Sequence, residues 1–269
     1  MKKNIILMAL AVAAFAACDK SVPYEPGAPM DENGPNVYFS AYNISDVTLG
    51  SDVSEFEIAV LRDDPTEALS VPLKSVCVND GIFTVPETVE FAAGEDSVAV
   101  KIQVGEVEMF TDYQITLTIP EEYTHAYAVT EVGPTYIANV VKEDYVPYAN
   151  GLYYDIFWAE TYYEKVLEYS ALRDEYRISD PWLTGATDIT FTWDGTEKVV
   201  PGSASYATGL YHPSYGGITA NVVNAAYVTY PAGSLMDVDC DVFQFDFEWT
   251  VSAGSFGEYP NLFIVLEVL

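Results

Sequence analysis

Two short segments of the sequence combine aromatic, polar and turn-forming residues in a way typical of a ligand-binding loop. They read "YRISDPW", which ends at Trp182, and "GLYHPSYGG", which contains Tyr211, His212 and Tyr215. Aromatic faces stack on the apolar faces of sugar rings, while histidine and other polar groups bond to hydroxyls. These four side chains are therefore the candidate ligand-binding residues. The alternative is that the aromatic rings close the ends of a β core and the glycines shape turns.

Catalytic chemistry finds little support in the sequence. The two histidines, His125 and His212, stand apart from any nucleophile motif, and two isolated histidines do not make a metal hydrolase site. A glycosidase needs only two carboxylates at a set separation, and the 41 acidic residues supply such pairs by chance. We therefore expect a protein that is not an enzyme, and we keep a glycoside hydrolase as the third hypothesis.

The amino terminus has the pattern of a secretory signal. Lys2 and Lys3 precede an apolar block that runs to Ala17, which is shorter than the ~20 residues of a membrane-spanning helix. Its last residues, "FAAC", resemble the lipobox of bacterial lipoproteins, in which a peptidase cuts before the cysteine and the sulfur carries a diacylglycerol. The resemblance implies a signal peptide over residues 1–17 and lipidation of Cys18; an ordinary signal peptide is the alternative.

The chain after Cys18 is expected to be a tether on a strongly acidic protein. Residues 18–35 are rich in proline and have no apolar period, which is typical of an extended, hydrated linker. The formal net charge is -30, so nucleic acid is excluded as a partner because its binding requires cationic neutralisation of phosphates. The residues after Cys18 also resemble export signals of the Bacteroides group, which implies an outer-membrane lipoprotein exposed at the cell surface.

Residues 36–144 alternate apolar and polar side chains with a period of two. The stretches "FEIAV", "VAVKIQV" and "YQITLTI" follow this pattern, and turn signals such as "RDDP", "NDG" and "AAGED" separate them. Such spacing predicts an antiparallel β-sandwich. The order "FEIAVLRDD", "LSVPLKSVCVNDGIF", "VEFAAGEDSVAVKIQV", "YQITLTI" resembles a Calx-beta-type, immunoglobulin-like domain, which recurs in surface lipoproteins of gut Bacteroidetes.

The resemblance raises a calcium hypothesis. Acidic loop residues hold calcium in that family, and the acids that match or lie near those loops are Asp80, Glu106, Glu108 and Asp112. Their oxygens could supply ligands for the six to eight positions that calcium prefers. Gly105 and Glu106 stand where the family often has an aspartate pair, so solvated loops are the alternative and no other cofactor is expected.

Residues 150–269 predict a second β domain, either a sandwich or a barrel-like fold. The linker before it reads "KEDYVPYANG", and the segment "VFQFDFEWTVS" places Phe243, Phe245, Phe247 and Trp249 on one face. The stretch "ETYYEKVLEYSALRD" suits a helix or a strand, and its β-rich surroundings favour a strand. The predicted fold class is therefore all-β, with two antiparallel β domains.

Three further side chains carry specific expectations. Cys77 and Cys240 are far apart in the sequence, so we expect buried thiols, with a bridge between the domains as the alternative. Ser97 lies in "DSV", which resembles the short O-glycosylation pattern of the Bacteroides group; an unmodified strand start is the alternative.

Two non-catalytic functions remain ahead of the enzyme. The first is a lipid-anchored surface protein that binds an extracellular glycan. The second is a structural or adhesion protein whose partner is another surface protein. In both cases outer-membrane lipid is the expected partner of Cys18.

Overall fold

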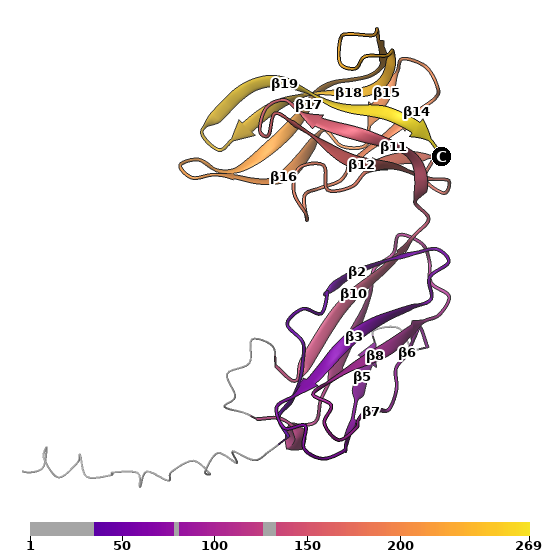
Figure 1. Cartoon of the computed structure of the whole chain (residues 1–269), viewed down its shortest axis with the longest axis vertical. Coiled ribbons are helices and arrows are strands. Elements are labelled where there is room, and N and C mark those ends of the chain that lie inside the picture. The colour runs from indigo at the N-terminus through magenta and orange to yellow at the C-terminus, as the bar shows by residue number, and fades with distance from the viewer. Residues whose placement is uncertain (1–34, 78–80, 126–132) are drawn as a thin grey trace, which may run out of the picture.

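The computed structural model describes residues 35–77, 81–125 and 133–269, which form two β units (Figure 1). The predicted all-β class is confirmed, since a single 3-10 turn at Glu121–Tyr123 accompanies the strands in the described residues. No helix in this part of the chain is long and apolar enough to cross a membrane. The predicted signal peptide, Cys18, most of the tether and Asp80 lie outside the described residues.

The first unit packs two four-stranded sheets around one core. Their orders are β1-β3-β8-β6 and β2-β10-β9-β5, and β4 and β7 form a separate pair. The strands are β1 (Val37–Phe39), β2 (Asp46–Gly50), β3 (Glu55–Arg62), β4 (Leu69–Pro72), β5 (Lys74–Cys77), β6 (Phe83–Thr84), β7 (Thr88–Phe91), β8 (Ser97–Val104), β9 (Tyr113–Thr118) and β10 (Thr135–Glu143). The predicted alternation is confirmed: Ile58, Val100 and Ile115 are among the residues of the buried core.

One pairing of the first unit departs from the antiparallel expectation. β2 lies parallel to β10, with Asp46 opposite Asn139. The two strands are far apart in the sequence, so no hairpin connects them and their relative direction is not restricted to antiparallel. The side-chain period is the same for both directions, which is why the sequence pattern did not distinguish them.

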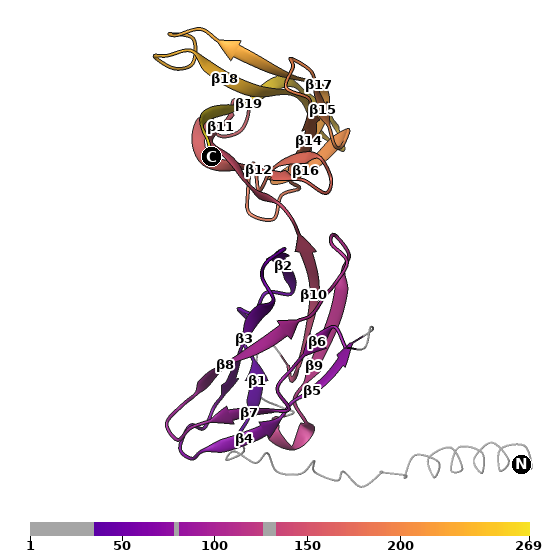
Figure 2. The same cartoon turned by 90° about the vertical axis from the view of Figure 1, so that its right-hand side faces the viewer.

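The second unit is one nine-stranded antiparallel sheet in the order β15-β14-β13-β12-β11-β19-β18-β17-β16. This order follows the chain around a ring, and the ring is visible in Figure 2. An isolated bridge between Lys198 and Ala226 brings the β15 side of the sheet against β17. The strands are β11 (Val146–Asp155), β12 (Thr161–Ser170), β13 (Glu175–Ile178), β14 (Ile189–Trp193), β15 (Val199–Pro201), β16 (Ser205–His212), β17 (Gly216–Tyr230), β18 (Cys240–Val251) and β19 (Gly254–Val268). The barrel-like alternative therefore describes this unit.

The barrel is filled by aromatic side chains. Phe243, Phe245, Phe247 and Trp249 of β18 all point inward and are fully buried, as their alternation predicted. The outer face of β18 is also covered, because Val242 packs in a second cluster that includes Leu235 and Met236 from the β17–β18 loop. The ambiguous stretch around residue 165 forms β12, so the prediction of a strand there is confirmed.

The two cysteines lie in different units. Cys240 is buried at the start of β18, as expected, and burial raises the pKa of its thiol. Cys77 is half-buried in β5 and packs against the core of the first unit. Both side chains therefore contribute chiefly to packing.

Pairing of β11 with β19 joins the first and last strands of the second unit into one sheet, and Gly151 allows the two strands to come close enough to pair. A Cβ atom at position 151 would lie 2.5 Å from the carbonyl oxygen of Ile264 and 2.5 Å from the ring of Phe263. Both distances are shorter than any ordinary contact, and one of the two obstacles is backbone. Only glycine allows β11 to lie this close to Phe263.

We predict that Gly151→Ala lowers the free energy of unfolding by about 1–3 kcal/mol, because the added methyl overpacks the seam between β11 and β19. Urea unfolding followed by tryptophan fluorescence measures the change. Gly217→Ala in β17 is the matched control, since a Cβ there meets nothing within 4 Å. Equal stability of the two variants would contradict this account of the seam.

The segment expected to be a linker belongs instead to the ends of two strands and to contacts between the two units. β10 ends at Glu143 and β11 begins at Val146, so Pro147 and Gly151 lie within β11. The Arg177 guanidinium of β13 forms an ion pair with Glu143 and lies 3.7 Å from the centre of the Tyr145 ring. These partly buried contacts restrain the sandwich against the barrel, and we call the group of Arg177, Glu143 and Tyr145 the clamp.

Candidate functional site

Three hairpin turns of the barrel meet at one end. They connect β11 to β12, β16 to β17 and β18 to β19, and the last two lie opposite the carboxyl terminus in Figure 1. Phe256 joins them, because its ring centre lies 5.6 Å from that of Phe157 and 5.7 Å from that of His212. We call this end of the barrel the hairpin surface and define it by its exposed and half-buried rings, which are Trp158, Tyr211, His212, Tyr215 and Phe256.

The structure places three of the four predicted ligand-binding residues on the β16–β17 hairpin: Tyr211 and His212 end β16 on opposite faces of the strand, and Tyr215 lies in the turn. Tyr211 is 67 % exposed and Tyr215 is also exposed. The rings of His212 and Tyr215 stack with their centres 4.6 Å apart and their planes at 26°. This arrangement presents flat aromatic faces to solvent from a rigid β scaffold, which is where binding sites commonly lie.

A backbone contact orients the imidazole of His212. The Ser214 N–H donates to His212 Nδ1 at 3.2 Å. Because Nδ1 accepts this bond, the neutral ring carries its proton on Nε2, a tautomer assigned from the hydrogen bond. The Nε2–H group is then a donor at the hairpin surface.

Trp182 is the exception, and the structure corrects its predicted role. Its side chain is only 8 % exposed and belongs to the barrel core. The indole Nε1 donates to Asn261 Oδ1 at 3.2 Å, and its ring lies 5.7 Å from that of Trp249. The loop between β13 and β14 therefore directs Trp182 into the barrel, so Trp182 presents no face to a ligand.

Trp158 and Phe256 belong to the hairpin surface, and the sequence did not single them out. Trp158 is exposed in the turn after β11, while Phe256 is half-buried near the start of β19. Neither residue stands beside the "GLYHPSYGG" segment in the sequence, and the pairing of β11, β19, β18 and β17 places them there. The sequence offered one weak signal for this site, which is that Trp158 lies outside any stretch of alternating apolar and polar residues.

Asp155 holds the turn that carries Trp158. Its Oδ1 atom accepts hydrogen bonds from the backbone N–H groups of Phe157 and Trp158, each at 3.0 Å. The carboxyl group is buried at the end of β11, and this burial raises its pKa above the ordinary value of 3.8. Burial therefore makes the ionised form of Asp155 less favourable in the folded state than in the unfolded chain.

We predict that Asp155→Asn makes the free energy of unfolding depend less on pH. A raised folded-state pKa means that the contribution of Asp155 is full below pH 3.8 and is lost as pH rises through the raised value. Asparagine carries no charge, so this loss of stability at higher pH disappears in the variant. Its side-chain oxygen still accepts hydrogen bonds from the N–H groups of Phe157 and Trp158. At neutral pH the variant should be at least as stable as the wild type.

Urea unfolding between acid and neutral pH measures this effect. Asp52→Asn, in an exposed turn of the sandwich, is the matched control. A marked loss of stability in Asp155→Asn at neutral pH would show instead that the charged carboxylate is required.

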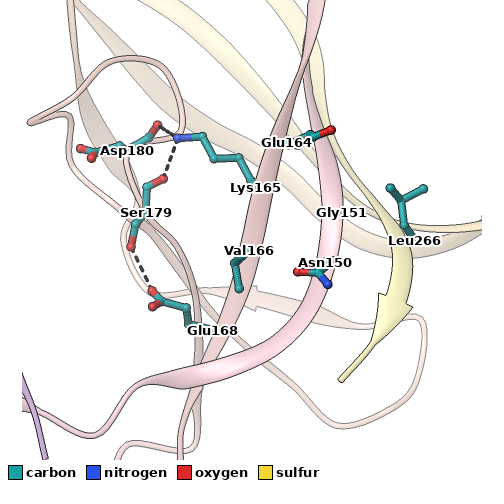
Figure 3. Close-up of a pocket in the computed structure, with 9 residues that line it drawn as sticks. All are labelled: Asn150, Gly151, Glu164, Lys165, Val166, Glu168, Ser179, Asp180 and Leu266. Carbon is teal, nitrogen blue, oxygen red and sulfur yellow. Dashed lines mark hydrogen bonds between the residues drawn. The ribbon is translucent and has the colours of Figure 1, made fainter.

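A pocket of about 560 Å³ lies on the flank of the barrel beside β12 (Figure 3). We call it the flank pocket. Its floor includes Gly151 and Val166, and the exposed side chain of Leu266 lies at one side. The complete lining is Asn150, Gly151, Glu164, Lys165, Val166, Glu168, Ser179, Asp180 and Leu266.

Hydrogen bonds from two positions of β12 hold Ser179 and Asp180, which line the side of the flank pocket across from that strand. Lys165 Nζ donates to the backbone carbonyl oxygens of Ser179 at 3.2 Å and of Asp180 at 2.6 Å. Ser179 Oγ donates to Glu168 Oε2 at 3.1 Å, and the same oxygen accepts from Arg177 Nε at 2.9 Å. The pocket is therefore built by side chains that are already held in place.

The acids proposed as calcium ligands do not form a site among the described residues. Glu106, Glu108 and Asp112 are all exposed between β8 and β9, and Asp80 lies outside the described part. In the residues that the structure describes, no group of three or more His, Cys, Asp or Glu side chains is placed to hold a metal. Ser97 is exposed at the start of β8, and its glycosylation remains a prediction.

No protein family and no curated protein matches the sequence. Among solved structures, the chain is similar to a Bacteroides ovatus protein of unknown function, with 9 % identity and a TM-score of 0.33 over 87 % of this chain and 95 % of that chain. It is also similar to the calcium binding domain CBD12 of CALX1.1, with 14 % identity and a TM-score of 0.33 over 74 % of this chain and 83 % of that one. A third is a Bacteroides ovatus multidomain protein that includes DUF1735, with 10 % identity and a TM-score of 0.32 over 86 % and 92 % of the two chains.

Proposed function

We propose that the protein is a non-catalytic binding protein for extracellular glycans and that the hairpin surface is its binding site. The observation that carries the proposal is the exposure of Trp158 and Tyr215 in turns and of Tyr211 near the end of β16, at the end of the barrel where Phe256 contacts Phe157 and His212. Exposed aromatic rings lose contact with water when a ring-shaped ligand covers them. The proposal needs no bound metal and no nucleophile.

The chemistry of the hairpin surface favours sugars over other ligands. Tyrosine and tryptophan faces match the flat apolar faces of sugar rings, and the Nε2–H of His212 offers a hydrogen bond to a hydroxyl or ring oxygen. The net charge of -30 repels polyanions, so a neutral polymer is the better ligand. Flat rings held by a rigid scaffold also lose little conformational entropy on binding.

We predict that Tyr211→Ala and Tyr215→Ala each lower the affinity for a neutral polysaccharide by about tenfold, which corresponds to the loss of about 1.4 kcal/mol of binding free energy. Affinity gel electrophoresis against a panel of neutral polysaccharides measures retardation of the wild type and the variants. Tyr42→Ala is the matched control, because Tyr42 is 95 % exposed but lies on the sandwich.

If no polysaccharide retards the wild type, or if the two variants and the Tyr42→Ala control are retarded equally, the hairpin surface is not a glycan site. Capture of a single protein partner by intact cells would then favour the adhesion hypothesis.

We further propose that the protein is anchored to the outer membrane through Cys18 and faces outward. The support is the "FAAC" end of the apolar block and the proline-rich segment after it, both of which lie outside the described residues except for Pro35. In this arrangement the sandwich acts as a spacer, and the clamp around Arg177 keeps the barrel at a fixed position on it. The hairpin surface is then presented away from the lipid.

We predict that Cys18→Ala abolishes lipid attachment, because the sulfur that would carry the diacylglycerol is absent. Metabolic labelling with an alkyne fatty acid in a bacterial lipoprotein-processing host measures attachment. Cys77→Ala is the matched control and should retain the label. A label that survives in Cys18→Ala would place the anchor elsewhere.

A further inference from the structure

We infer that the flank pocket is a second binding site of the barrel and that it takes an uncharged unit of the same linear oligosaccharide that covers the hairpin surface. This inference rests on the proposed function, because it extends the same ligand along the barrel. The strand β12 connects the two places: it starts beside the turn of Trp158 and passes through the pocket at Val166.

An exposed aromatic ring lies on β12 between the turn and the pocket. Tyr162 is 44 % exposed, and its ring stacks on that of Tyr154 with centres 4.3 Å apart and planes at 17°. Tyr162, Glu164 and Val166 alternate along the strand and so share one face. From Tyr162 to Val166 the strand rises about 13 Å, so one extended ligand spans both.

The flank pocket offers the mixed chemistry that a sugar ring requires. The side chains of Val166 and Leu266 are exposed and apolar, and the amide of Asn150 can both donate and accept hydrogen bonds. Lys165 uses two of its three N–H donors on the carbonyl groups of residues 179 and 180 in the described structure, which leaves one donor. Its volume of about 560 Å³ lies within the range of ~300–1,000 Å³ that is typical of small-molecule sites.

The charges around the pocket select against anionic units. Glu164, Glu168 and Asp180 all line it, and Lys165 is the single cation of the lining. Glu168 is compensated by Arg177, but Glu164 is exposed. An acidic sugar would face this carboxylate directly, so the site fits a neutral, hydroxyl-rich unit.

Oligosaccharide length provides the test. Calorimetry would use unbranched neutral oligosaccharides of the malto, cello, xylo, laminari and manno series, from disaccharide to octasaccharide. For the series that binds, we expect the affinity of the wild type to rise with length. Tyr162→Ala and Asn150→Ala should lower octasaccharide affinity by about tenfold and leave disaccharide affinity unchanged.

Tyr163→Ala is the matched control, because Tyr163 is 37 % exposed but lies on the opposite face of the same strand. If affinity does not increase with length, or if Tyr163→Ala weakens octasaccharide binding as much as Tyr162→Ala, the second site is overturned and the hairpin surface stands alone. If no oligosaccharide binds the wild type, the proposed function fails as well.

Discussion

The barrel depends on one close contact, in which the backbone of β11 at Gly151 lies against the ring of Phe263 and the carbonyl group of Ile264 in β19. These strands are the first and last of the second unit, so their pairing completes the order of nine strands. The pairing joins β11–β15 and β16–β19 into one curved sheet, which buries the aromatic residues of β18 on the inside. The hairpin surface exists because antiparallel pairing of β11 with β19, β19 with β18 and β18 with β17 brings three separate turns to one end.

The same region couples the barrel to the sandwich. Arg177 forms ion pairs with Glu143 of β10 and Glu168 of β12, and Glu168 in turn accepts a hydrogen bond from Ser179 in the flank pocket. One carboxylate therefore belongs both to the clamp between the units and to the pocket wall. Since removal of one partner from a partly buried ion pair leaves the other uncompensated, the clamp and the pocket are expected to respond together to changes at Glu168.

The sequence predicted those features that follow from local alternation. The inward-facing residues of β18 were found because period two persists over most of that strand. The strand β12 lacks a clear period and was predicted from its β-rich surroundings. Alternation does not distinguish an open sandwich from a ring, nor a parallel from an antiparallel neighbour, so barrel closure and the β2–β10 pair required the structure.

The candidate site was predicted only in the part that is continuous in the sequence. Tyr211, His212 and Tyr215 lie on one hairpin and were recognised together, whereas Trp158 and Phe256 reach the same surface through long-range pairing. Trp182 was misjudged because a loop sequence says little about the direction in which its ring points. A buried acceptor, Asn261 Oδ1, determines that direction here.

The central claim is that neutral glycans bind at the aromatic turns of the barrel. Its most direct measurement is solution NMR with isotope-labelled tyrosine rings, recorded during titration with the polysaccharide that retards the protein most strongly. The account predicts that the signals of Tyr211 and Tyr215 shift and that those of the buried Tyr153 and Tyr206 do not. Shifts confined to tyrosines of the sandwich, such as Tyr42, would contradict it.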